Sequence, residues 1–336
     1  MTTTDKPALR ITGPADLISA VPYLLGFHPQ DSLVLIGLAD SHLVVTARLD
    51  LDALTSQVLT DTIGAIVRGG TTDLIAAVYT NAQHPTSAAD LPQRSIIEQV
   101  SGVAESSTVT LIEGLLVTAD RWWSYSCESP ACCPPDGRPF TATTVFQTEA
   151  VVAGLTVVPT REALADMFAA VPDRPDLAEL IARHEHLELS AALNGSRDAW
   201  ARSVTRALFV AHRGAQDGRM PTDEDVARYG VGLQSYAVRD AMWMGVDDGR
   251  LAGIDLWVNL ARRLPSPHDA APLFLAAWSA FRDGNGALAG IAATKALESD
   301  PGYSAADLLL AALAHGIDPR SLPRLRATKG DKDTNQ

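Results

Sequence analysis

Short apolar runs alternate with amphipathic segments through the first 160 residues of the chain. Residues 32–38, 72–80 and 108–118 are apolar runs bounded by turn residues, a pattern typical of buried strands. Residues 53–68 and 91–106 lie between them and carry apolar side chains at helical spacing. Strands that alternate with helices indicate an α/β fold in which helices cover a sheet.

Further elements flank this alternation. Residues 42–51 follow the first strand after the tight connection 39–41, so we expect a hairpin and therefore a mixed sheet. A helix is expected over 14–25, and another over 143–155. The remaining expected elements are a strand and the loop that follows it, over 121–126 and 128–139.

Strand-like alternation gives way to helical spacing after residue 160. We therefore predict an α/β domain over 1–160, an all-helical domain over 161–320 and a flexible tail over 321–336. The boundary is expected between Val158 and Pro175, where prolines punctuate the chain, and the two halves are expected to be separable.

The last helices of the chain carry a more specific pattern. Residues 271–316 are expected to form helix, turn, helix, turn and helix, and they resemble a tetratricopeptide repeat. One repeat cannot bury its own faces, so neighbouring helices should complete the stack. Trp278, with Phe274 one turn before it, is predicted to pack in the core between these hairpins.

Composition and charge narrow the class of protein. The hydrophobic content is 46% and the charged content 20%, so the chain can bury a sizeable core. The net charge is −13 and acidic residues outnumber basic ones in both halves, which argues against a nucleic-acid partner. Neither a signal-peptide core nor a long apolar run is present, so we expect a cytoplasmic protein with no membrane partner.

Two common nucleotide-binding motifs are missing from the sequence. No GxGxxG follows the first strand, and no GxxxxGK[ST] occurs anywhere. The dinucleotide-binding fingerprint and the P-loop are therefore both unsupported.

All three cysteines lie in one aromatic, turn-rich stretch, RWWSYSCESPACCPPDG, over 121–137. An odd number of thiols in a reducing compartment argues against a disulfide framework. Cys127, Cys132 and Cys133 are so near in sequence that we expect them to form one local site, close to His28.

Three interpretations of this stretch remain open. The thiols could pack a tight loop against the neighbouring tryptophans. They could bind zinc, with His28 as the fourth ligand beside the three cysteines. Alternatively, Cys127 or Cys132 could be a reactive thiol, activated by His28 or Arg121, and would then be catalytic.

Alternation along 121–127 places Arg121, Trp123, Tyr125 and Cys127 on one face of the expected strand. Cys127 would then stand at the strand end, where α/β proteins often place functional groups. Trp123 and Tyr125 are therefore candidate ligand contacts.

The stretch GFHPQDS, over 26–32, offers a second set of candidates. Asp31 could orient the His28 imidazole and Ser32 could act as a nucleophile, or both could contact a ligand. The simpler interpretation is a turn in which Asp31 and Ser32 bond to the local backbone.

Two stretches resemble a known family. Residues 9–38 contain G-F-H-P-x-D-S, and residues 121–139 contain W-x-S-Y-x-C-x4-C-C-P-x-x-G. Together they resemble the actinobacterial proteins known as domain of unknown function 4192. The resemblance runs along nearly the whole chain and implies no particular activity.

Two classes of function follow from these observations. The favoured one is a non-enzymatic binding protein, in which an α/β platform carries a helical region that binds a protein or peptide. The alternative is an enzyme, or a protein that binds a small molecule or a metal, with a Cys/His site in the α/β domain. No recognisable catalytic constellation is present in the sequence, which favours the first class.

Overall fold

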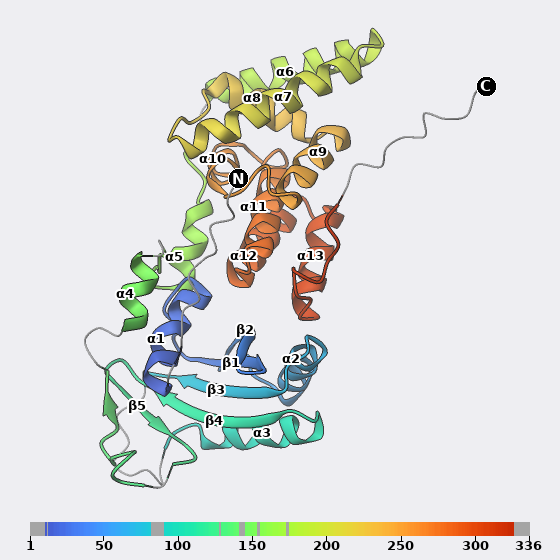
Figure 1. The fold of residues 1–336 in the computed structure, drawn as a ribbon. Coiled ribbons are helices and arrows are strands. Elements are labelled where there is room, and N and C mark those ends of the chain that lie inside the picture. The colour runs from blue at the N-terminus through green and yellow to red at the C-terminus, as the bar shows by residue number, and fades with distance from the viewer. Residues whose placement is uncertain are drawn as a thin grey trace, which may run out of the picture. The chain divides into compact units, whose positions relative to one another are not determined.

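The computed structural model describes residues 11, 13–81, 91–127, 129–140, 145–152, 155–172 and 175–325 (Figure 1). The chain divides into two compact units, Met1–Leu164 with Ala314–Asp318, and Ala165–Leu313 with Pro319–Gln336. Independent folding of the two halves stays a prediction. Among the helices of the described ranges, none is long and apolar enough to cross a bilayer.

The first unit is built on a mixed six-stranded sheet in the order β2-β1-β3-β4-β5-β6. The strands are β1 (Ser32–Ala39), β2 (His42–Asp50), β3 (Asp73–Tyr79), β4 (Thr110–Val117), β5 (Arg121–Ser124) and β6 (Arg138–Pro139). β1 and β2 form the expected antiparallel hairpin, and β3 and β4 are parallel. The α/β fold class is therefore confirmed, with a mixed sheet.

Two helices of the first unit, α2 (Ser56–Arg68) and α3 (Arg94–Ser106), cover one face of this sheet. The first unit also contains α1 (Pro14–Leu25) and α4 (Val145–Val152). The apolar faces of α2 and α3 join strand residues of β1, β3 and β4 in one core, to which Trp123 and Tyr125 also belong. α1 packs on α4 in a smaller cluster around Phe146.

The end of the sheet differs from the sequence prediction. β5 stops at Ser124, and Tyr125 and Ser126 form a bend, so the alternation expected through Cys127 ends early. The sequence does not predict β6, because its two residues lie inside the expected loop and carry no apolar alternation. It pairs with β5 through Trp122 and Arg138, so the cysteine loop is closed by the sheet at both ends.

Helices make up the second unit, as the sequence predicts. After α5 (Arg161–Ala165) they are α6 (Pro175–Leu193), α7 (Arg197–Gln216), α8 (Asp223–Leu233), α9 (Tyr236–Asp247), α10 (Asp255–Arg263), α11 (Ala270–Arg282), α12 (Gly286–Ser299) and α13 (Ser304–Ala314). α11 and α12 pack together as a hairpin joined by Asp283–Asn285, and α13 follows them. The order of three helices is confirmed, while the tetratricopeptide resemblance stays a prediction.

A buried charge ties the last described residues to the helices. The Asp247 carboxylate accepts hydrogen bonds from Trp278 Nε1 at 3.1 Å and from Arg282 Nε at 2.5 Å. It also accepts the backbone N–H of Leu325, and Arg282 donates to the carbonyl oxygens of Pro319 and Leu322. Residues 319–325 are therefore held against α9 and α11, although the sequence places the start of the flexible tail at 321.

Candidate functional site

Trp123 on β5 is the anchor of the cysteine loop. Its side chain is 2% exposed and lies in the core beside α3, because its side of β5 faces the helices. Its indole Nε1 donates to the carbonyl oxygen of Pro135 at 3.0 Å, so the far side of the loop is fixed to the ring. Arg121 adds hydrogen bonds to the carbonyl oxygens of Asp136 and Gly137, at 2.9 and 3.2 Å.

Gly137 closes the loop directly against the Trp123 ring. Its φ of +74° lies in the left-handed region, and a Cβ at this position would stand 2.3 Å from Trp123 Cε2. Both the backbone and the packing therefore require glycine here. This explains why a glycine ends the motif C-C-P-x-x-G.

Replacing Gly137 with alanine is expected to destabilise the protein by about 2–5 kcal/mol. The left-handed backbone costs about 1–2 kcal/mol with a Cβ, and the overlap with Trp123 adds about 1–3 kcal/mol. Gly70→Ala is the matched control, because Gly70 has φ +90° and open space around its Cα. Chemical denaturation should show a larger loss for Gly137→Ala, and equal losses would refute the packing argument.

A tight turn brings the two adjacent cysteines to the same side. The backbone N–H groups of Cys132 and Cys133 both donate to the carbonyl oxygen of Ser129, at 3.0 and 2.7 Å. In a strand, neighbouring side chains point to opposite faces, whereas in a helical turn they are only about 100° apart. The turn therefore allows both thiols to face Cys127.

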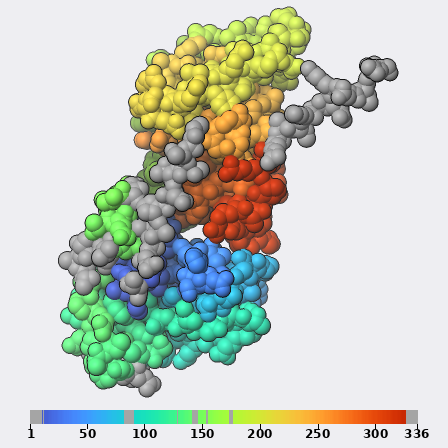
Figure 2. Space-filling model, in the orientation of Figure 1, coloured from blue at the N-terminus to red at the C-terminus, as the bar shows by residue number. Residues whose placement is uncertain are grey.

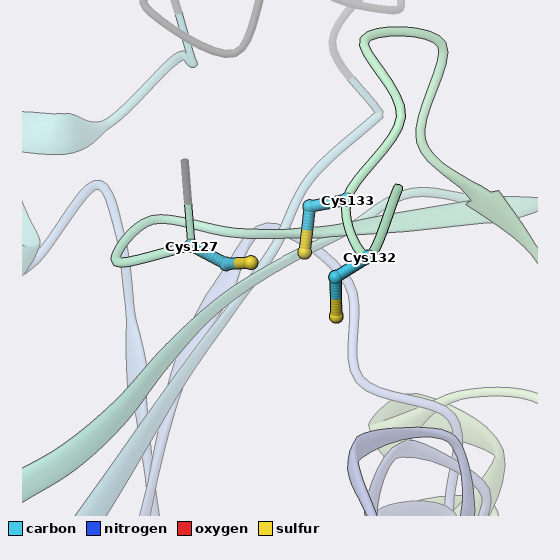
Figure 3. A group of neighbouring side chains, drawn as sticks. All are labelled: Cys127, Cys132 and Cys133. Atoms are coloured by element: carbon cyan, nitrogen blue, oxygen red, sulfur yellow. The ribbon is translucent and has the colours of Figure 1, made fainter. Parts of the chain in front are cut away.

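The three thiols converge in space, as Figure 3 shows. The sulfur atoms of Cys127, Cys132 and Cys133 all lie within 4.8 Å of one another. Cys133 is buried, Cys127 is half-buried and Cys132 is exposed, and all three are free thiols. The prediction that the cysteines form one local cluster is confirmed.

The cluster is electrostatically asymmetric. Hydrogen bonds from the Cys133 thiol and from the Ser129 backbone lower the pKa of Cys127. Burial, together with the neighbouring thiols, raises the pKa of Cys133 to about 12. Cys133 therefore keeps its proton and shares it with Cys127, which is the more easily ionised thiol.

Glu113 on β4 holds the start of the loop. Its Oε1 accepts hydrogen bonds from Ser124 Oγ at 2.8 Å and from Ser126 Oγ at 3.0 Å. Ser124 Oγ in turn accepts the backbone N–H of Cys127 at 3.1 Å. The negative charge of Glu113 opposes ionisation of Cys127, so this carboxylate adds to the anionic character of the site.

His28 does not complete the set of ligands. The structure places it in an exposed position, where its backbone N–H donates to the carbonyl oxygen of Val158 at 3.2 Å. Among the described residues, the group of mutually close ligand atoms holds the three cysteines and no histidine. The groups that lower the pKa of Cys127 all lie within the loop, and neither His28 nor Arg121 is among them.

The remaining candidate residues have local structural partners. Asp31 Oδ1 accepts the backbone N–H of Asn81 at 3.4 Å, while Ser32 donates to the carbonyl oxygen of Gln30 and accepts from Arg48 at 2.8 Å. β3 and β4 lie between β1 and β5, so the turn at Asp31 and Ser32 begins a strand that is separate from the cysteine strand. These bonds agree with the simpler interpretation of that stretch as a turn.

The rings of Trp123 and Tyr125 are both buried. Tyr125 donates its hydroxyl to the carbonyl oxygen of Pro92 at 2.6 Å, and Arg94 lies over its ring. Both side chains therefore shape and support the loop from the core side, and we place them among its structural supports.

A family model described as "Domain of unknown function (DUF4192)" matches residues 14–320. The chain belongs to this family. The DUF4192 match includes the thiol loop and all the helices from α1 to α13. No curated protein and no solved structure matches the chain. For this DUF4192 protein, function therefore has to be argued from the site.

Proposed function

We propose that the loop between β5 and β6 binds a thiophilic divalent metal ion, with zinc as the expected ion and the three cysteines as its ligands. The observation that carries this proposal is the convergence of three sulfur atoms within 4.8 Å. Zinc–thiolate bonds of about 2.3 Å in a tetrahedral site place sulfur atoms about 3.8 Å apart. Small side-chain rotations would bring the cluster to that spacing.

The surroundings of the thiols support a cation. A proton now shared between Cys133 and Cys127 holds two sulfur atoms together, and a metal ion can take its place. The carboxylate of Glu113 adds negative charge nearby. The exposed Cys132 gives an ion a path from solvent, while the buried Cys133 limits the motion of the site.

Zinc content tests the proposal directly. The purified chain is incubated with zinc and then passed over a desalting column that removes the free metal. It is expected to retain about one equivalent of zinc per chain. A competitive titration with a chromophoric chelator gives the affinity. Ser126→Ala is the matched control, since Ser126 lies in the same loop but bonds to Glu113 rather than to a thiol. If neither the wild type nor Ser126→Ala retains zinc, the metal site is contradicted.

The zinc affinity is expected to rise with pH between about 6 and 8. The pKa of Cys133 is raised to about 12, so its proton must leave when the metal binds, and higher pH makes that release easier. Calorimetric titrations in buffers with different ionisation enthalpies would count the protons released. Binding without proton release would show that the thiols are not the ligands.

A reactive thiol is the competing interpretation of the same loop, and the lowered pKa of Cys127 favours it. Timed alkylation separates the two. If the site binds zinc, the metal should protect all three cysteines, and chelation should restore labelling. If Cys127 is a nucleophile without a metal, it should label quickly whether or not zinc is present.

Partner binding by the helical region is a second candidate function. On α6, Leu189 and Leu193 lie four residues apart on one face, with 54% and 79% of their surface exposed. α6 and α7 form part of the visible surface in Figure 2, in yellow-green to yellow. Exposed large apolar side chains at helical spacing are what an interacting protein or peptide would cover.

Peptide selection tests this second candidate. Peptides selected by the wild-type chain should fail to bind the double variant Leu189→Glu/Leu193→Glu. Tyr236→Glu is a control, because it changes another exposed side chain on a different helix. Equal binding by the wild type and the α6 variant would exclude this face as the binding surface.

A further inference from the structure

The thiol cluster offers three of the four ligands that zinc takes in proteins. Structural zinc sites have four protein ligands, whereas sites with three protein ligands keep a position for water or substrate. In the part of the chain that the structure describes, no histidine or carboxylate oxygen joins the three sulfur atoms. Cys132 is exposed and Cys127 is half-buried, so the cluster has an accessible side.

Resting on the metal site proposed above, we infer that the bound ion keeps its fourth coordination position for a ligand from outside the chain. Water fills this position at rest, and a neutral nitrogen donor replaces it. The chemical class that fits is an imidazole or amine nitrogen, carried by a small molecule or by a partner protein.

Charge decides the preference for a neutral donor. Three thiolates around a divalent ion leave a net charge of −1. The carboxylate of Glu113 lies nearby, because its Oε1 accepts a hydrogen bond at 3.0 Å from Ser126, the residue before Cys127. An anionic fourth ligand would add a further negative charge to this site. A neutral nitrogen completes the tetrahedron without that repulsion.

The same charge makes the bound water a weak acid. In sites with neutral histidine ligands, the full charge of zinc lowers the pKa of its water to about 7. Three thiolates cancel that charge, so the water here should remain protonated at neutral pH. The site is therefore suited to ligand capture rather than to generating hydroxide.

Cobalt substitution tests this inference on the 336-residue chain. Cobalt-loaded protein is titrated with imidazole and, separately, with azide, while the visible absorption bands are recorded. Imidazole is expected to shift the bands saturably with the cobalt still bound, and azide should bind at least 10-fold more weakly. Without imidazole, and with the cobalt kept fully bound, pH changes around 7 should leave the spectrum unchanged. A preference for azide, or a titration near pH 7, would overturn the charge argument.

Two variants test whether the chain itself supplies the fourth ligand. His28 is exposed, and Glu128, between Cys127 and Ser129, lies outside the described residues. His28→Ala and Glu128→Gln should both leave the cobalt spectrum and its response to imidazole unchanged. A wild-type spectrum that ignores imidazole but changes in either variant would overturn the inference while leaving the metal site standing. Failure to bind cobalt or zinc at all would instead remove the proposed function.

Discussion

Replacing Cys133 with serine is expected to lower the zinc affinity of the protein by more than about 100-fold. Loss of a partner that merely orients a ligand costs about 10–100-fold, and loss of a ligand should cost more. Cys133 is the buried member of the cluster and shares its proton with Cys127, so its sulfur is the most firmly placed of the three. A hydroxyl at this position is a much poorer zinc ligand than a thiolate.

Competitive titration of the three single cysteine-to-serine variants measures this effect. Cys127→Ser and Cys132→Ser should lose affinity as well, whereas Ser126→Ala should retain it. Denaturation without metal shows whether each variant still folds. A folded Cys133→Ser protein with unchanged zinc affinity would mean that the cluster is packing and not a metal site.

Replacing Trp278 with alanine is expected to cost about 3–5 kcal/mol of stability, as for other large core aromatics. The Trp278 side chain is 9% exposed and meets Trp243 edge to face, with ring centroids 5.2 Å apart. Its Nε1 donates a hydrogen bond to the buried carboxylate of Asp247, which also accepts a hydrogen bond from Arg282 Nε. Truncation would leave a cavity and remove one donor from a buried charge.

Chemical denaturation of matched variants tests the role of Trp278. Trp278→Phe keeps an aromatic ring but loses the N–H donor, so it should cost less than alanine. Tyr236→Ala removes a highly exposed aromatic side chain from the same unit and should cost little. Unchanged unfolding of Trp278→Ala would contradict a core position for this side chain.

Local patterns in the sequence predict most of the elements of this fold. Burial of one or both faces of an element leaves a pattern of apolar positions in its sequence. This pattern is visible as apolar runs at β1, β3 and β4 and as amphipathic spacing at α2 and α3. The first β-hairpin follows from two strands joined by a tight connection. The spatial order of the strands cannot be predicted from such local patterns. It depends on contacts between distant parts of the chain, since β3 pairs with β1 as well as with β4.

The sequence also predicts that the cysteines meet, since they lie within seven residues of one another. It does not predict how they meet. The pair Ser129-Pro130 indicates that a turn begins here. It does not indicate that the backbone N–H groups of Cys132 and Cys133 both donate to Ser129, which brings the two thiols to one side. The alternation along 121–127 predicts a strand through Cys127, whereas the chain bends at Tyr125.

Two supporting residues of the site had weak signals in the sequence. Glu113 is the one charged residue of the apolar strand β4, and it anchors Ser124 and Ser126. Gly137 follows two prolines and an aspartate, which indicates a turn but not its contact with Trp123. His28, by contrast, was prominent in its motif, yet the structure does not place it in the thiol group.

X-ray absorption at the zinc edge is the most direct measurement of the central claim, that the three cysteines bind one metal ion. On the zinc-loaded chain, three sulfur neighbours at about 2.3 Å and one nitrogen or oxygen neighbour at about 2.0–2.1 Å are expected. A shell made of nitrogen and oxygen alone, with no sulfur, would contradict it.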